Sequence, residues 1–263
     1  MPSAEGVAPA DTVRADWGAH FERFGARGTF VLLDTGTGRT HRYAPERAAE
    51  RLTPASTSKL FNALVFVDRG LVADVDSMHA WDGVERSIAV WNQDHSLRTG
   101  VGNSAVWLFQ RLAREVGRGG YREVFARQPY GNSTMGEPLH MAWLDGSWRV
   151  SADEQVAFVD GLRRGSLGFS PEAQATVRGI TPVLASGTSP DGGTWRLLGK
   201  TGWALREGEP DLGWIVGWVE RADGDWVYAM NAQATREGSP WNMAPDRLRL
   251  VQAVLRGEGL IGG

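Results

Sequence analysis

The sequence predicts an α/β (α+β) fold, in which both chain ends contribute strands to one antiparallel sheet flanked by helices, with a helical insert between them. Two observations predict this arrangement. The segment 74–196 mixes helical spacing with Gly and Pro loops and has few strand-like runs. The strand-like runs lie near the two chain ends, at 29–33, 39–43, 195–198, 212–219 and 226–229.

The N-terminal elements follow from local patterns. Aromatic residues at helical spacing predict a helix over 17–24. The apolar run 29–33 predicts a strand, the turn residues 34–38 reverse the chain, and 39–43 forms the return strand of a hairpin. Pro54 then marks the approach to a second helix.

That second helix has its apolar body at 60–67, and the final helix spans 245–257, where Pro245 suits the first turn. Polar turns separate the three C-terminal strands. We expect a single domain over 1–263 because no linker or repeat interrupts the chain. Within it we expect a sheet subdomain at about 17–55 and 195–263, and a helical subdomain at about 56–194.

Composition excludes several functional classes. The 263 residues carry a net charge of -3 and no densely basic stretch, so binding to nucleic acid or to an anionic membrane is not indicated. No apolar run approaches the ~20 residues that span a bilayer. The absence of cysteine excludes disulfides, thiolate metal sites and a cysteine nucleophile. The segment 1–13 lacks the apolar core of a secretory signal, so we expect either a cytosolic protein or a signal already removed.

Lysine usage points to the chemistry. The chain has 26 arginines but only two lysines, Lys59 and Lys200, and each lies in a recognisable motif. Arginine keeps its proton near neutral pH, whereas a buried lysine can lose it and act as a base. The residues Ser56 to Lys59 form S-x-x-K, in which the lysine amine can reach the serine hydroxyl and activate it as a nucleophile. Taken alone, the motif also fits a serine that only caps a helix.

The second lysine opens Lys200-Thr201-Gly202, a K-T-G sequence. Together with Gly199 it resembles the end of a phosphate-binding P-loop. We reject the P-loop because Thr194 stands where its first glycine is needed, and the intervening residues look like a strand. The order of S-x-x-K followed by K-T-G is typical of penicillin-recognising serine enzymes.

Further motifs make the chain resemble class D β-lactamases, the oxacillinase family, over nearly its whole length. The resemblance rests on Pro54–Lys59, Asn62–Leu64, Trp81–Gly83, Trp91–His95, Ser104–Val106, Tyr130–Asn132, Trp143–Gly146, Lys200–Trp203, Gly217–Glu220 and Glu258–Gly263. It implies the penicillin-recognising serine enzyme fold. It also implies hydrolysis of the β-lactam ring of penicillin-type antibiotics, in the periplasm or outside the cell after removal of a signal peptide.

The resemblance implies catalytic roles for four side chains. Ser56 is the acylated nucleophile. Lys59 is the general base, carbamylated by carbon dioxide or bicarbonate, and no other cofactor is expected. Ser104 passes a proton to the departing nitrogen, and Lys200 stays charged and orients the substrate. The main-chain N–H groups of Ser56 and Trp203 form the oxyanion hole.

The remaining implied residues shape the pocket and hold the substrate. Val106 and Leu144 are apolar walls of the carbamate pocket, and the Trp143 indole holds the carbamate. Gly202 and Trp203 contact the substrate.

Thr201 and Arg247 are expected to bind the substrate carboxylate. By its pattern alone, however, Arg247 is a surface residue of the last helix, and Val106, Trp143 and Leu144 are equally consistent with plain core. Ser58 stands where the family often has a bulky apolar residue, and a polar group facing Lys59 would destabilise a carbamate.

Three alternatives come from other functional classes. A β-lactam sensor domain would stay acylated, and a cell-wall D-Ala-D-Ala peptidase would share both lysine motifs but more often carry asparagine at the position of Val106. A metal hydrolase has little support, because the five histidines show no ligand-type spacing. We expect a small-molecule β-lactam as the only partner of a monomer or homodimer without a metal.

Overall fold

The computed structural model describes residues 11–189 and 192–262 and confirms the predicted fold class. Most of the segment 1–13 and Gly263 of the closing motif lie outside the described residues. The helices are α1 Gly18–Arg23, α2 Pro45–Ala49, α3 Lys59–Asp68, α4 Leu97–Asn103, α5 Val106–Arg127, α6 Ala142–Asp145, α7 Ala152–Arg164, α8 Pro171–Ile180 and α9 Met243–Gly257. The strands are β1 Thr12–Val13, β2 Ala26–Asp34, β3 Thr40–Tyr43, β4 Val183–Thr188, β5 Thr194–Ala204, β6 Leu212–Arg221 and β7 Trp226–Ala234.

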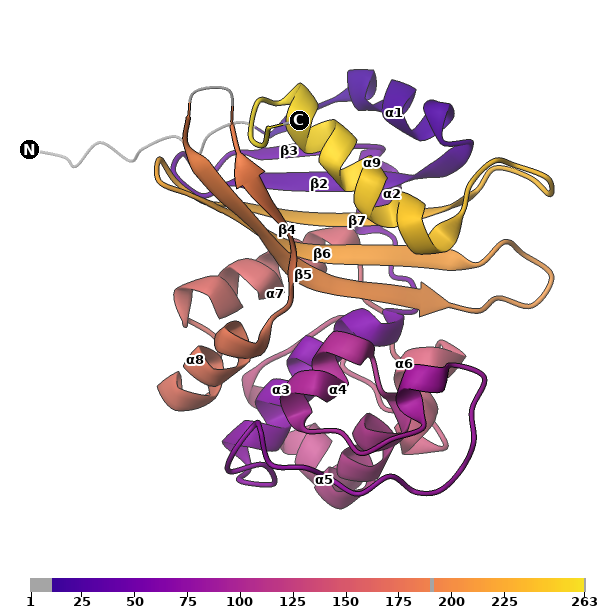
Figure 1. Ribbon diagram of the computed structural model, residues 1–263, viewed down its shortest axis with the longest axis vertical. Coiled ribbons are helices and arrows are strands. Elements are labelled where there is room, and N and C mark those ends of the chain that lie inside the picture. Colours follow the sequence, from indigo (N-terminus) through magenta and orange to yellow (C-terminus); the bar gives the residue numbers. More distant parts are fainter. Residues whose placement is uncertain (1–10, 190–191, 263) are drawn as a thin grey trace, which may run out of the picture.

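Both chain ends build one seven-stranded sheet in the order β1-β3-β2-β7-β6-β5-β4. All neighbouring strands pair antiparallel except β1 and β3. The helices α1 and α9 cover one face of the sheet, while the group α3 to α6 lies on the other side (Figure 1). On that second side α7 contacts β2, β6 and β7 directly. The sheet therefore joins two hydrophobic cores.

Alternating side chains on β2 supply both cores. Phe30 and Leu32 pack with the α1 and α9 side, whereas Val31 packs with the helices on the other face. The interior strand β6 is buried over Leu212 to Val219, as expected for a strand covered on both faces. Its continuous apolar run is the feature that made it recognisable in sequence.

The strand β4 corrects one prediction. It lies inside the segment 74–196, which we expected to be poor in strands, yet it pairs with β5 at the edge of the sheet. Its sequence Val-Leu-Ala-Ser-Gly-Thr lacks apolar alternation because neither face of β4 is buried, and the strand gains its order from pairing with β5. The last helix also begins two residues earlier than predicted, at Met243.

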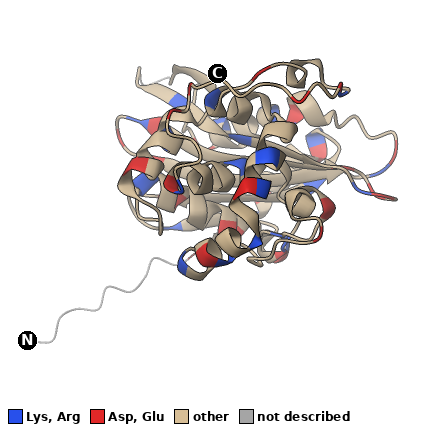
Figure 2. Ribbon diagram, turned by 90° about the horizontal axis from the view of Figure 1, so that it is seen from below, with Lys and Arg blue, Asp and Glu red and all other residues tan. Residues whose placement is uncertain are grey.

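Charged residues of both signs are interspersed along the ribbon in the view of Figure 2. Many form local pairs, for example Arg163 and Arg164, which share the carboxylate of Asp160. Within the described ranges, no helix is both long and apolar enough to cross a lipid bilayer.

Candidate active site

The turn that carries Ser56 lies directly before α3. Residues Ala55–Ser58 form one 3-10 turn, and α3 begins at Lys59. The Lys59 side-chain nitrogen Nζ lies 2.9 Å from Ser56 Oγ. The cap positions are Pro54 for this turn and Ser58 for α3, so Ser56 lies within the turn and is not a helix cap. The serine hydroxyl instead faces a base, as nucleophilic catalysis requires.

Burial changes the protonation of Lys59. The side chain is 0% exposed, and its Nζ lies 5.1 Å from the centre of the Phe109 ring. Loss of water around the amine lowers the pKa of Lys59 to about 7. A substantial fraction of neutral amine is therefore present near neutral pH, and only this form accepts a proton or attacks carbon dioxide.

A second serine–lysine contact joins residues 96 positions apart. Ser104 follows α4 in a left-handed conformation with φ 58, and Lys200 lies in β5. The distance from Lys200 Nζ to Ser104 Oγ is 2.5 Å. Non-glycine residues with positive φ are uncommon and collect at functional sites, so this geometry is consistent with a chemical role for Ser104.

The environment of Lys200 disfavours the positive charge that we predicted for its side chain. Burial lowers the pKa of Lys200 well below its usual value, and the neighbouring Lys59 and Arg247 lower it further. The charged form of Lys200 is therefore less favourable here than for a lysine in water. A substrate carboxylate close to Lys200 would favour the charged form that we predicted.

A cleft of about 630 Å³ connects these groups. Most of its lining comes from the segments around the two lysine motifs, α6 and the start of α9. The lining residues are Ser56, Ser87, Ile88, Trp91, Asn103, Ser104, Val106, Met141, Leu144, Thr201, Gly202, Trp203, Ala204, Leu205 and Arg247. Ser56, Ser104, Thr201 and Trp203 thus meet in one cavity, while Lys59 and Lys200 reach it through the two serines.

The predicted carbamate pocket has one unusual group. Val106 and Leu144 line the cleft, whereas Trp143 is 0% exposed. The Trp143 indole Nε1 is buried and has no hydrogen-bond partner among the described residues. Because α6 contacts the 3-10 turn of Ser56, this unused donor belongs to the same region as Lys59. Ser58 is also buried, but its hydroxyl donates to the Ala55 carbonyl at 2.7 Å and so is already satisfied.

Arg247 is not the solvent-exposed residue that its helical pattern indicates. It is 8% exposed, its Nε donates to Met243 O at 2.8 Å, and its Nη1 donates to Gly202 O. Its guanidinium also lies over the Trp203 ring, 5.9 Å from the centroid. Burial lowers the pKa of Arg247 to about 10, so the group remains charged at neutral pH.

Gly202 is needed for close packing between β5 and the nucleophile turn. A Cβ atom at this position would lie 2.9 Å from Pro54 O and 3.2 Å from Thr57 Cγ2. These distances are tighter than ordinary contacts, so a larger residue would push β5 away from Ser56.

Several residues of the cleft escaped the sequence-based prediction. Asn103 and Met141 line it, although neither belongs to a motif that carries chemistry. The turn Tyr130 to Asn132 makes structural contacts. Asn132 Nδ2 donates to Ser147 O at 2.7 Å, and Gly131 has φ 61 where a Cβ would strike Arg149 O.

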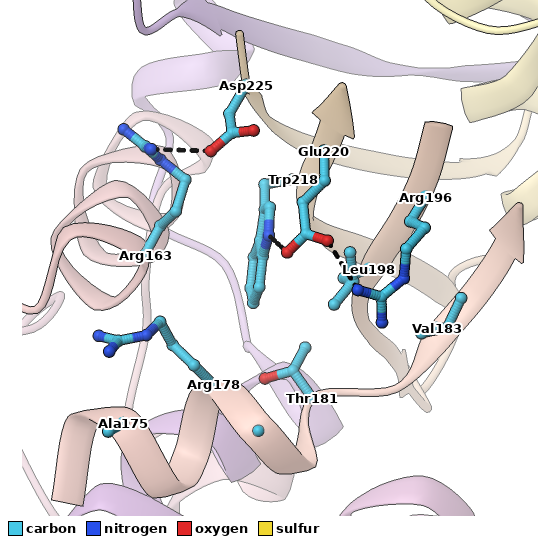
Figure 3. A pocket seen from close by; sticks show the side chains of 11 residues that line it. Arg163, Ala175, Arg178, Thr181, Val183, Arg196, Leu198, Trp218, Glu220 and Asp225 are labelled. Carbon is cyan, nitrogen blue, oxygen red and sulfur yellow. Dashed lines mark hydrogen bonds and ion pairs between the residues drawn. The ribbon is translucent and has the colours of Figure 1, made fainter. Parts of the chain in front are cut away.

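A second cavity of about 510 Å³ lies between α8 and the strands β4 to β6 (Figure 3). Four of its charged groups are paired, since Arg163 binds Asp225 and Arg196 binds Glu220, each at 2.9 Å, and Arg178 donates to Leu162 O at 3.1 Å. None of the predicted site residues lines it, and it holds no serine next to a base. The cleft at Ser56 is therefore the candidate active site.

Comparison with known proteins agrees with this geometry. Residues 28–244 match the family of the penicillin binding protein transpeptidase domain. The β-lactamase OXA-2 of Salmonella typhimurium is 37% identical over 248 residues, which cover 92% of this chain and 84% of the relative.

Two solved structures have a similar fold. The class D β-lactamase FUS-1 of Fusobacterium nucleatum has a TM-score of 0.84 at 32% identity, covering 94% of this chain and 99% of that one. The C-terminal domain of the Bacillus licheniformis BlaR penicillin-receptor has a TM-score of 0.85 at 28% identity, covering 97% and 99%.

Proposed function

The chain belongs to the class D β-lactamases, serine enzymes that share the penicillin binding protein transpeptidase domain, and we propose that it hydrolyses penicillin-type antibiotics with a carbamylated Lys59 as its general base. The contact of 2.9 Å between Lys59 Nζ and Ser56 Oγ carries the proposal. It places an amine of lowered pKa against a hydroxyl that faces the cleft.

In the proposed acylation, Lys59 accepts the Ser56 proton while Oγ attacks the carbonyl carbon of the β-lactam. The main-chain N–H groups of Ser56 and Trp203 stabilise the resulting oxyanion. As the carbon–nitrogen bond of the ring breaks, Ser104 donates a proton to the departing nitrogen. The proton that Lys59 took from Ser56 replaces the one lost by Ser104, so Lys59 is free to act as base again in deacylation. Lys200 Nζ, at 2.5 Å from Ser104 Oγ, holds that hydroxyl in place.

Deacylation uses the same base with water as nucleophile. Lys59 takes a proton from the water, the water oxygen attacks the ester carbonyl, and Ser56 Oγ recovers its proton as it leaves. When present, a carbamate on Lys59 supplies an anionic oxygen as the base. The buried and unused Trp143 Nε1 supports this modification, because it would gain an acceptor that the unmodified site does not offer.

A steady-state assay tests the function directly. We expect turnover of a penicillin and of an oxacillin-type penicillin, with activity against a cephalosporin and a carbapenem measured alongside. Each substrate is assayed with and without bicarbonate. Absence of any turnover, despite stoichiometric acylation, would contradict the hydrolase and favour a sensor.

The sensor alternative has a specific observation behind it, namely the likeness to the BlaR penicillin-receptor domain. The fold alone does not separate the two functions, because the β-lactamase FUS-1 fits equally well. The higher sequence identity to OXA-2 favours the enzyme. A peptidase is disfavoured by the apolar Val106 in the cleft.

Arg247 and Thr201 are proposed to bind the substrate carboxylate. Arg247→Ala should lower kcat/KM by a factor that corresponds to about 1.5–3 kcal/mol for a hydrogen bond to a charged group. Thermal stability should fall as well, because the buried guanidinium bridges α9 and Gly202 O of β5.

The carboxylate role is separated from the structural role by comparing a penicillin with its methyl ester. Wild type should prefer the acid, and Arg247→Ala should turn over both at similar rates. If the variant retains the wild-type preference for the acid, the proposed contact is wrong.

Metal removal should leave hydrolysis intact, because the proposed steps need only serine and lysine. Among residues 11–189 and 192–262, no group of three potential ligand side chains converges. Activity in EDTA is measured after dialysis. Loss of turnover that zinc restores would overturn the serine mechanism.

We also propose a periplasmic or secreted location, in keeping with a substrate that reaches the cell from outside. Cell fractionation tests the location: the protein should be found in the culture medium or the periplasmic extract, separate from a cytosolic marker. Sedimentation velocity distinguishes a monomer from a homodimer, the two states that we expect.

A further inference from the structure

The turn that presents Ser56 has a strained backbone. Ala55 has φ 48, a left-handed conformation that is unfavourable for a residue with a Cβ and persists only when its surroundings hold it. Its neighbours hold it from several sides. Trp214 Nε1 donates to Thr53 O at 2.9 Å, and Gly202 allows β5 to approach Pro54 O closely.

A chain of buried hydrogen bonds holds the turn from the side of α7. Thr57 Oγ1 donates to Pro54 O at 2.7 Å and accepts from Gln155 Nε2 at 2.8 Å. The Tyr130 hydroxyl then donates to Gln155 Oε1 at 2.5 Å. Thr57 and Gln155 are 0% exposed and Tyr130 is 2% exposed, so water does not compete for these bonds.

In this chain of hydrogen bonds, the donor and acceptor of each bond are fixed by the bond before it, starting at Tyr130. Burial raises the pKa of Tyr130 well above its usual value, so its hydroxyl keeps a proton to donate. That bond turns the Gln155 oxygen toward Tyr130 and the amide nitrogen toward Thr57. Thr57 Oγ1 is then an acceptor on one side, and its own hydrogen is directed to Pro54 O. A flipped amide would instead demand that hydrogen and release Pro54 O.

We propose that Gln155, oriented by Tyr130, is a positioning residue that acts through Thr57 to keep Ser56 in place for acylation. Gln155 is not among the residues that line the cleft, and it lies 98 positions along the chain from Thr57. The proposal rests on the proposed function of Ser56. In this proposal Tyr130, the first residue of a turn with otherwise structural contacts, orients the Gln155 amide.

The test removes each hydrogen bond and measures the acylation rate constant by stopped flow with a chromogenic β-lactam. Gln155→Leu and the nearly isosteric Thr57→Val should each slow acylation by about 10- to 100-fold, the range expected when a reacting group is misplaced by about 1 Å. The double variant should be no slower than the slower single variant, because both changes break one chain. Thr57→Ser keeps the hydroxyl that Thr57→Val removes, so this variant should acylate at most of the wild-type rate.

Gln174→Leu is the matched control. Gln174 is 1% exposed on α8, and its amide bonds to main-chain groups of Leu167 and Phe169, far in sequence from the turn. It should lower Tm as Gln155→Leu does, yet acylate at the wild-type rate at a temperature well below both transitions.

Two results would overturn the positioning role. One is a Gln155→Leu enzyme that loses stability but acylates normally, and the other is a strictly additive double variant. If Gln155→Leu does not fold, a wild-type rate in Thr57→Val is sufficient to reject the proposal. A wild-type protein that is not acylated at all would instead reject the proposed function.

Discussion

Ser56→Ala is expected to abolish both the covalent adduct with β-lactams and their hydrolysis, with a loss of turnover on the order of 10⁶-fold, as for other serine nucleophiles. The reason is direct, because Ser56 Oγ is the hydroxyl that contacts the base, and it opens onto the cleft. Intact-mass measurement after mixing with a slow β-lactam should show one adduct on wild type, on the peptide that contains Ser56.

Ser170→Ala is a suitable control for this substitution. Ser170 caps α8 through a bond from Ala173 N, so its loss affects stability but leaves the cleft unchanged. The control should form the adduct at the wild-type stoichiometry. An adduct of the same mass on Ser56→Ala would show that another residue is the nucleophile.

Lys59→Ala is expected to have the second-largest effect, lowering turnover by about 10²–10⁴-fold, the range for a lost general base. Any acyl-enzyme that still forms should persist, because the base for deacylation is gone. Mass spectrometry over time distinguishes this trapped species from the transient adduct of wild type. A Lys59→Ala enzyme that turns over normally would contradict the assignment.

The dependence on pH and bicarbonate follows from the same side chain. The pKa of Lys59 is lowered to about 7, and the active form is the deprotonated one, so activity should fall as pH decreases through about 7. A carbamate forms only from the neutral amine. Its loss at acidic pH should therefore also lower the activity. Added bicarbonate should restore part of the activity.

Direct observation of Lys59 tests the carbamate itself. A crystal grown at mildly alkaline pH with bicarbonate should show the modified side chain next to Trp143 Nε1. Unmodified Lys59 under these conditions would leave the free amine as base. A polar Ser58 facing Lys59 was predicted to destabilise the carbamate, but the Ser58 hydroxyl donates to Ala55 O at 2.7 Å.

The sequence by itself determined the fold class and the identity of the chemical groups. Apolar runs at both chain ends predicted the shared sheet, since strand patterns are local, and the structure confirms them in β2, β5, β6 and β7. The scarcity of lysine singled out Lys59 and Lys200, because the choice between lysine and arginine is visible in composition alone. Spacing within four residues also placed Lys59 next to Ser56, since the intervening turn is short.

The tertiary structure decided the features that depend on distant neighbours. Arg247 is buried because Gly202 and Trp203 of β5 meet it, which a helical pattern does not reveal. The lowered pKa of Lys200 arises from burial and from two cations brought near it by folding. The bond from Gln155 to Thr57 likewise spans 98 residues. Burial and long-range contacts set these energies, and both depend on the path of the whole chain.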